Sequence, residues 1–166
     1  MSTAISKLSE LLSEKVKVTN QVIEENIISK EASIIGDIAS HLINSGGKRI
    51  RPLLTLACSR LFDYHGDKDT FLAAAIEYIH SATLLHDDVI DRSEKRRGLK
   101  TANVVWTNKY SVLVGDFLFS RAFQLMVRSE SLRVMKTLSD ASAIISQGEI
   151  LQVGIEKKLD ASKEDY

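Results

Sequence analysis

The 166-residue chain contains few residues that break helices, with one proline and eight glycines. Such a composition favours long helices joined by few turns. Cysteine is also rare: the single Cys58 excludes an internal disulfide and is consistent with a reducing compartment. No apolar run reaches membrane-spanning length, and the N-terminus has no apolar core of signal-peptide length. We therefore expect a cytoplasmic protein without a membrane span.

The chain also has no net charge, because 22 lysines and arginines balance 22 aspartates and glutamates. A neutral chain is not steered towards nucleic acid, so a general nucleic-acid binder is not expected. The hydrophobic content of 44% suffices for one domain with its own core. Neither a strand pattern nor an internal repeat is convincing, so the sequence predicts a single all-α domain over residues 1–166.

Hydrophobic residues recur at helical spacing along most of the chain. Within the apolar run 111–127, Gly115 permits close packing, and Asp116 is an odd charge that needs a partner if it is buried. The predicted helices cover about residues 6–28, 33–43, 52–62, 71–91, 102–110, 111–127 and 131–159.

Three aspartates end the predicted helix over 71–91. Asp87, Asp88 and Asp91 are three and four residues apart, so they project to much the same side of the helix. The helix before them is apolar nearly all round and is therefore expected to be buried. At an effective dielectric of about 20, two carboxylates about 6 Å apart repel by about 3 kcal/mol. A hard cation such as Mg²⁺ would relieve this repulsion and share its shell with phosphates. The alternative is a solvated acidic helix end.

An arginine-rich loop follows the aspartates. Arg96 and Arg97 precede Gly98, which lets the loop bend tightly. Planar guanidinium groups beside a bound metal suit the oxygens of a diphosphate. The alternative is a solvated charge run paired with Glu94.

A second basic segment, GGKRIRP at residues 46–52, opens a helix at Pro52. Lys48, Arg49 and Arg51 lie next to the positive end of that helix, which makes the segment a second candidate anion site. The alternative is a glycine cap followed by solvated basic residues. His80 lies two turns before Asp87 on the same side, so we predict a diphosphate contact rather than a core role. Glu77 and His86 are interpreted as structural.

These segments resemble, in this order, the N-terminal half of the trans-isoprenyl diphosphate synthases, the polyprenyl synthetase family, and its long-chain branch most. The segments are GGKRIRP, the helix with His80, LLHDDVIDRSEKRRG, NVVWTNKYSVLVGDFLFSRAF and QGEILQ. The resemblance covers residues 33–166 and implies an all-α helical bundle of the isoprenoid synthase type.

The resemblance implies a prenyltransferase that condenses isopentenyl diphosphate with an allylic diphosphate, using Mg²⁺, for isoprenoid or quinone side-chain biosynthesis. By the family pattern, Asp87 and Asp91 are metal ligands and Asp88 supports them, while Arg96 contacts the allylic diphosphate. The residues that would hold isopentenyl diphosphate are Lys48, Arg51, His80 and Arg97.

Product length is predicted from the residues below the metal. Thr83, Ala82 and Ile79 lie four, five and eight residues before Asp87, and none is aromatic. Short-chain members of the family often place a bulky ring here, so we expect an open tunnel and a long polyprenyl product.

One departure from the family pattern concerns length. Family members are much longer, and their second half supplies a Lys-Thr pair and a second aspartate-rich motif, whereas this sequence ends at Tyr166, before that lysine is expected. We therefore expect a truncated or split synthase that is incomplete for catalysis, and that forms a homodimer or pairs with a missing C-terminal half. The alternatives are a non-catalytic regulatory subunit of a heteromeric synthase and a terpene cyclase fragment; GGKRIRP and His80 speak against the cyclase.

Overall fold

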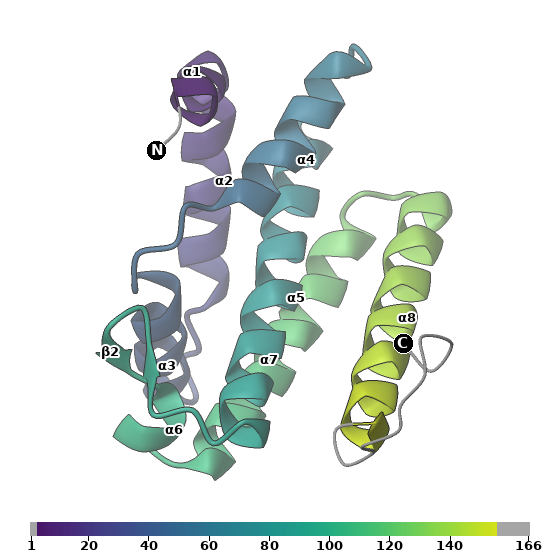
Figure 1. The fold of residues 1–166 in the computed structure, drawn as a ribbon. Coiled ribbons are helices and arrows are strands. Elements are labelled where there is room, and N and C mark those ends of the chain that lie inside the picture. Colours follow the sequence, from purple (N-terminus) through teal and green to yellow (C-terminus); the bar gives the residue numbers. More distant parts are fainter. Residues whose placement is uncertain (1–2, 156–166) are drawn as a thin grey trace. The chain divides into compact units, whose positions relative to one another are not determined.

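The structure, a computed structural model, describes residues 3–155 in two compact units, the first ending at Ser129 and the second beginning at Glu130. The prediction of an all-α protein is confirmed, since the only strands in the described residues are two residues long. No helix within residues 3–155 has both the length and the apolar character needed to cross a membrane. The second unit contains α8 (Leu132–Ile155), and the first contains α1 (Thr3–Leu11), α2 (Ser13–Asn26), α3 (Ser33–Ile43), α4 (Ile50–Leu61), α5 (Lys68–Ile90), β1 (Lys95–Arg96), β2 (Leu99–Lys100), α6 (Ala102–Val105) and α7 (Asn108–Val127) (Figure 1).

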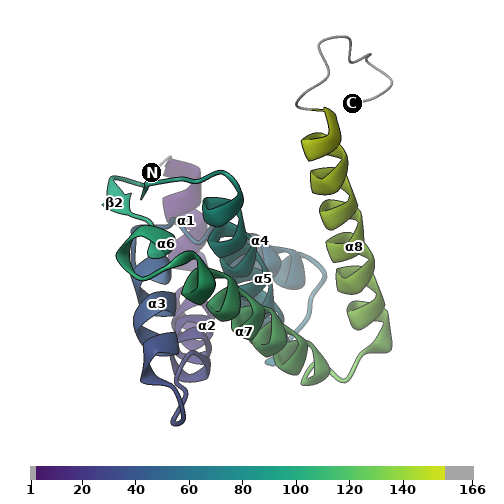
Figure 2. The same ribbon diagram turned by 90° about the horizontal axis from the view of Figure 1, so that it is seen from below.

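Helix α5 is the centre of the first unit, and α2, α4 and α7 all pack against it (Figures 1 and 2). Small side chains let these neighbours approach closely, because four alanines of α5 are fully buried. Tyr78, also fully buried, donates a hydrogen bond from its hydroxyl to the carbonyl of Ile23 on α2, at 2.6 Å. Ser111 ties α7 to the other end of α5 by donating to the carbonyl of Leu85 at 2.8 Å. The four alanines are Ala73, Ala74, Ala75 and Ala82.

An ion pair fixes the first turn of α5. Asp69 is buried, and its Oδ1 lies 2.7 Å from Nζ of Lys15 on α2. Its other oxygen accepts a hydrogen bond from the hydroxyl of Ser59 on α4 at 3.0 Å. Because both oxygens are satisfied, the buried charge is compensated and three helices are joined at the end of α5 that lies away from the aspartates.

The predicted helix over 6–28 is wrong in one respect, since α1 and α2 are separate helices that break at Leu12. Leu12 is buried together with Leu53 and Leu56 of α4, and Ile5 and Leu8 of α1 pack against that cluster. The break thus brings the apolar side of α1 onto α4. No glycine or proline marks it in the sequence.

Most of the remaining helices follow the prediction closely, but the helix predicted over 102–110 is wrong: α6 ends at Val105, and residues 108–110 belong to α7. The helix predicted over 33–43 coincides with α3, and the one predicted over 52–62 begins two residues earlier, as α4. Helix α8 covers the predicted run from Leu132 to Ile155, while residues 156–159 of that prediction lie outside the described residues. The prediction of one domain over residues 1–166 likewise reaches beyond them and stays a prediction.

Packing between α5 and α7 confirms the role of Gly115. A Cβ added there would lie 2.3 Å from Nε2 of His86 on α5. Asp116 is not buried: its side chain is 64% exposed, and Oδ1 lies 3.4 Å from Nε2 of His86. The charge sits on the exposed side of α7, where water solvates it.

Candidate active site

The three aspartates at the end of α5 have three different environments. Helix α5 ends at Ile90, and Asp91 is its C-cap residue, with its N–H donating to the carbonyl of Asp87 at 2.8 Å. Asp91 is exposed, Asp87 is half-buried and Asp88 is only 1% exposed. Since the C-terminal end of a helix carries partial negative charge, carboxylates gathered there need cations to offset them.

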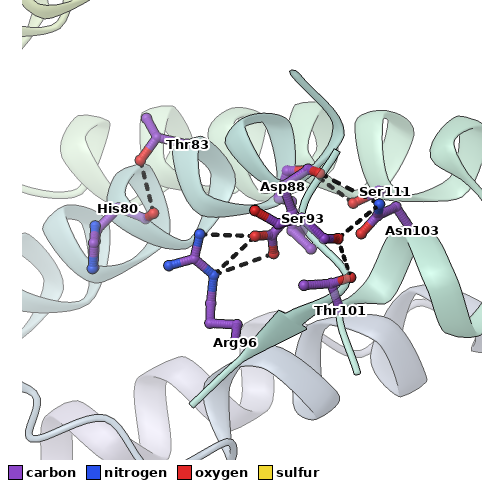
Figure 3. A network of polar contacts seen from close by, with 9 residues as sticks. His80, Thr83, Asp88, Ser93, Arg96, Thr101, Asn103 and Ser111 are labelled. Atoms are coloured by element: carbon purple, nitrogen blue, oxygen red, sulfur yellow. Dashed lines mark hydrogen bonds and ion pairs between the residues drawn. The ribbon is translucent and has the colours of Figure 1, made fainter. Parts of the chain in front are cut away.

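Arg96 compensates the buried carboxylate of Asp88 (Figure 3). Its Nη2 donates to Oδ1 at 2.8 Å, and its Nε lies 3.1 and 3.2 Å from the two carboxylate oxygens. This pair therefore orients the guanidinium of Arg96 through two of its three nitrogens. The third, Nη1, takes no part in the pair and is directed to the side of His80 (Figure 3).

Hydrogen bonds hold the loop that carries Arg96 against the end of α5 (Figure 3). The carbonyl of Asp88 accepts from the N–H of Ser93 at 2.9 Å and from the amide of Asn103 at 3.3 Å. The carbonyl of Ser93 in turn accepts from the hydroxyl of Thr101 at 2.7 Å. Thr101 directly precedes α6, but its side chain fastens the loop and does not cap the helix.

The arginine-rich loop is a tight antiparallel hairpin in which Arg96 pairs with Leu99. Arg97 and Gly98 form its turn, and both have positive φ, 52° and 84°. Positive φ at both central residues is typical of the turns that join two strands by two residues, and glycine adopts it without strain. The predicted bend at Gly98 is thereby confirmed, and it leaves Arg97 exposed at the tip.

The Gly46–Pro52 turn meets this hairpin. A Cβ added to Gly47 would lie 2.8 Å from Nη1 of Arg97, so the absence of a side chain leaves room for the guanidinium. Lys48 and Arg51 of the turn are both exposed. The two basic segments that the sequence placed far apart therefore lie together in the first unit.

His80 lies within the electrostatic reach of this cationic group. Burial, and then the charges of Arg51, Arg97 and Arg96, lower the pKa of His80 to about 4. The imidazole is therefore neutral at pH 7 and can donate one hydrogen bond to an anion. Burial also raises the pKa of Glu77, one turn earlier on α5, against the opposing effect of nearby arginines.

A comparison with sequence models of protein families finds one match, to polyprenyl synthetase, over residues 32–166. The chain belongs to the polyprenyl synthetase family. It is 41% identical over 162 residues to octaprenyl diphosphate synthase of Escherichia coli K12, covering 98% of this chain and 50% of that protein. The chain thus spans about half the length of the relatives it matches.

Solved structures of polyprenyl synthases share the fold. A decaprenyl diphosphate synthase from Rhodobacter capsulatus matches with a TM-score of 0.94 and 48% identity, over 98% of this chain and 50% of that one. A polyprenyl synthase from Caulobacter crescentus, complexed with calcium and isoprenyl diphosphate, matches with a TM-score of 0.94 and 44% identity. That match covers 100% of this chain and 50% of the Caulobacter chain.

The aspartates of this polyprenyl synthetase family member do not form a metal cage of their own. In the part of the chain that the structure describes, no three His, Cys, Asp or Glu side chains are arranged to hold a metal ion. One or two carboxylates are nevertheless enough for Mg²⁺ when substrate phosphates complete its shell. Asp87 and Asp91 fit that requirement as oxygen donors, whereas Asp88 is engaged with Arg96.

The predicted chain-length residues differ in exposure. Ile79 and Thr83 are half-buried, and the hydroxyl of Thr83 donates to the carbonyl of His80 at 2.9 Å (Figure 3). Ala82 is fully buried. An aromatic side chain in place of Ala82 would therefore have to displace packed neighbours. An aromatic side chain in place of Thr83 would lie on the same side of α5 as His80.

Sequence reasoning missed several residues that shape the site. Glu77 was interpreted as structural, although it lies half-buried among the charges of Arg49, Arg51 and Arg97. Asn103 of α6 and Ser93 of the loop were not singled out, because no spacing rule connects these donors with the carbonyl of Asp88 near the end of α5. A carboxylate on an otherwise apolar face, three residues before a histidine, is the signal that could have pointed to Glu77.

Proposed function

We propose that this chain supplies the diphosphate-binding part of a long-chain polyprenyl diphosphate synthase, a prenyltransferase of isoprenoid or quinone side-chain biosynthesis. Its substrates would be isopentenyl diphosphate and an allylic diphosphate. The close approach of the Arg97 guanidinium to Gly47 carries the proposal, because it brings two basic segments together next to the Asp88–Arg96 pair. Carboxylates beside converging guanidinium groups suit a diphosphate that meets a metal ion and arginine together.

The proposed cofactor is Mg²⁺, held by Asp87 and Asp91. Both offer the hard oxygen donors that Mg²⁺ prefers, and Asp88 supports them through Arg96. Calcium and isoprenyl diphosphate in the Caulobacter structure support a divalent cation together with a prenyl diphosphate. When bound, Mg²⁺ would neutralise negative charge that builds on the leaving diphosphate.

The other residues divide between the two substrates. Arg96, held by Asp88 through Nε and Nη2, would donate from Nη1 to the allylic diphosphate. Cleavage of the C–O bond would release diphosphate and leave an allylic cation, which apolar surroundings would protect from water. The double bond of isopentenyl diphosphate would attack that cation, and loss of a proton would restore a double bond in the product. Isopentenyl diphosphate itself would be held by Lys48, Arg51, Arg97 and the neutral imidazole of His80.

Titration calorimetry with each substrate tests these assignments. Asp91→Asn should abolish the Mg²⁺-dependent binding of the allylic diphosphate, whereas Glu94→Gln, an exposed carboxylate nearby, should not. Arg97→Met should weaken isopentenyl diphosphate binding, whereas Lys95→Met, an exposed cation of the same hairpin, should leave it unchanged. Equal effects of a site variant and its control would overturn the assignment.

Turnover would need the half of the relatives that this chain does not match, supplied by further sequence or by a partner chain, in a homodimer or a mixed assembly. The chain alone and the chain mixed with the second half of a matched relative can be compared for polyprenyl product. Polyprenyl product from the mixture, with none from the chain by itself, supports the proposal that the second half completes the active site. Steady synthesis by the chain alone refutes it, and an inactive mixture of folded parts favours a regulatory subunit.

A further inference from the structure

Arg49 has a different environment from the other cations of the Gly46–Pro52 turn. Lys48 and Arg51 are exposed, whereas Arg49 is half-buried. Its backbone is left-handed, with φ 45° and ψ 42°, at the N-cap position of α4. A side chain other than glycine is strained in that conformation and keeps it only where its surroundings hold it in place.

A residue of α2 supplies that support. Nη1 of Arg49 donates a hydrogen bond to Oδ1 of Asn20. Beside this bond is a small pocket of about 50 Å³, which both residues line together with Val16, Lys48 and Leu53. The buried Thr19 precedes Asn20, and α2 packs on both α4 and α5, so the acceptor is fixed in the first unit.

The chemistry of Asn20 suits a turn that binds an anion. A carboxylate at this position would hold Arg49 too, but it would cancel positive charge next to Lys48 and Arg51. A neutral amide oxygen holds the guanidinium and leaves the positive potential in place. Asn20 also lies before residue 32, where the match to the polyprenyl synthetase family begins.

We propose that Asn20 is a positioning residue: it holds Arg49 in its left-handed conformation and thereby sets the directions of Lys48 and Arg51 for a diphosphate. The use of the turn by isopentenyl diphosphate rests on the proposed function, while the support of Arg49 by Asn20 does not. The two parts are therefore tested by separate measurements.

Hydrogen exchange tests the support of the turn without any ligand. The N–H of Leu53 donates to the carbonyl of Arg49 at 3.2 Å, so its exchange rate reports whether Arg49 keeps its cap conformation. Asn20→Ala should speed exchange at Leu53 about tenfold, the loss expected for one hydrogen bond to a charged group. Asn20→Asp, which still accepts from Arg49, should restore the slow rate. Gln21→Ala is the control, since Gln21 is exposed and bonds to Glu25 of its own helix.

Two outcomes of the exchange experiment overturn the proposal. In the first outcome, the amide of Leu53 exchanges as slowly in Asn20→Ala as it does in the control Gln21→Ala. In the other, Leu53 and the amide of Leu56, one turn deeper in α4, speed up equally, which means that Asn20 supports the whole helix and not the turn.

Ligand titrations of the 166-residue chain, followed by NMR, test the consequence for binding. Asn20→Ala should raise the Kd of isopentenyl diphosphate about tenfold and leave that of the Mg²⁺-bound allylic diphosphate unchanged. Asn20→Asp should give an intermediate Kd because of its added charge. Equal weakening of both ligands overturns the positioning role. If the unaltered chain binds neither ligand, the proposed function fails, and the exchange rates alone decide whether Asn20 holds Arg49.

Discussion

Replacing Arg96 with methionine takes the guanidinium away from a carboxylate that water scarcely reaches. Asp88 is 1% exposed, and three donor–acceptor contacts of 2.8, 3.1 and 3.2 Å to Arg96 now compensate its charge. A buried charge left without its partner destabilises a protein by about 3–5 kcal/mol. We therefore expect Arg96→Met to lower the free energy of unfolding by about that amount.

The reverse substitution should cost much less. Asp88→Asn keeps an oxygen that can accept from Arg96, and the side chain of Arg96 is 28% exposed, so water reaches part of its charge. Losing one charge from a hydrogen-bonded pair of this kind costs about 1–2 kcal/mol. The two single variants, which break the same ion pair, are thus predicted to differ because only Asp88 is fully buried.

Urea denaturation followed by circular dichroism measures both effects, provided that the slope m stays constant. The double variant Asp88→Asn, Arg96→Met should be more stable than the sum of the two single effects implies, because it leaves no uncompensated charge. Lys95→Met, an exposed neighbour of Arg96, should stay within about 0.5 kcal/mol of the unaltered chain. The reasoning is refuted if Asp88→Asn is as destabilising as Arg96→Met, or if the two effects simply add.

Three further predictions follow from the same region. The pKa of His80 is lowered to about 4 by burial and by arginines, so the unfolded chain binds a proton that the folded chain excludes between about pH 6.5 and 4, and stability should fall as the pH falls through that window. Allowing for the partial exposure of the ring, we expect the free energy of unfolding to fall by about 1–2 kcal/mol across this window. Urea midpoints measured at both ends of the window should show this fall, and the fall should be smaller in His80→Gln. Gly47→Ala should displace the Arg97 guanidinium, 2.8 Å from the added Cβ, and weaken isopentenyl diphosphate binding in calorimetry, whereas Gly148→Ala, with nothing within 4 Å, should not. In an enzyme completed by a second half, Thr83→Phe should shorten the polyprenyl product, and an unchanged chain length on chromatography would contradict the predicted tunnel.

Spacing along the helix was enough to predict which residues gather at the end of α5, but not what each one contacts. Helical spacing predicted that Asp87, Asp88 and Asp91 project to much the same side, but Asp88 is buried while Asp91 is exposed. The partner of Asp88 lies on a hairpin that begins several residues later, and the two-residue strands of that hairpin are too short to show a pattern. The sequence therefore predicted a common role for the three aspartates, whereas the structure pairs one of them, Asp88, with Arg96.

The elements of the fold were predictable for a related reason. Long apolar periodicities, as in α3, α5 and α7, dominate the choice between helix and coil. The break at Leu12 was not predictable, because it depends on the packing of α1 against Leu53 and Leu56 and not on a local residue preference. The left-handed Arg49 has the same origin, since its anchor Asn20 is on another helix.

The charges around the end of α5 divide into groups, and that division would let one small surface take the two proposed diphosphates. Asp88 and Arg96 compensate each other, so neither adds a net charge to the site. Asp91 is an exposed carboxylate at the negative end of α5, one turn after Asp87, and an anion would be repelled there unless it arrived with a divalent cation. Arg51 and Arg97 act on the neutral imidazole of His80, and Lys48 is an exposed cation of the same turn as Arg51, so an anion would be attracted there without any metal. Two anions of the same kind could thus be told apart by whether they carry a cation. Under the proposed function, this difference would place an allylic diphosphate beside the aspartates and isopentenyl diphosphate beside the basic residues.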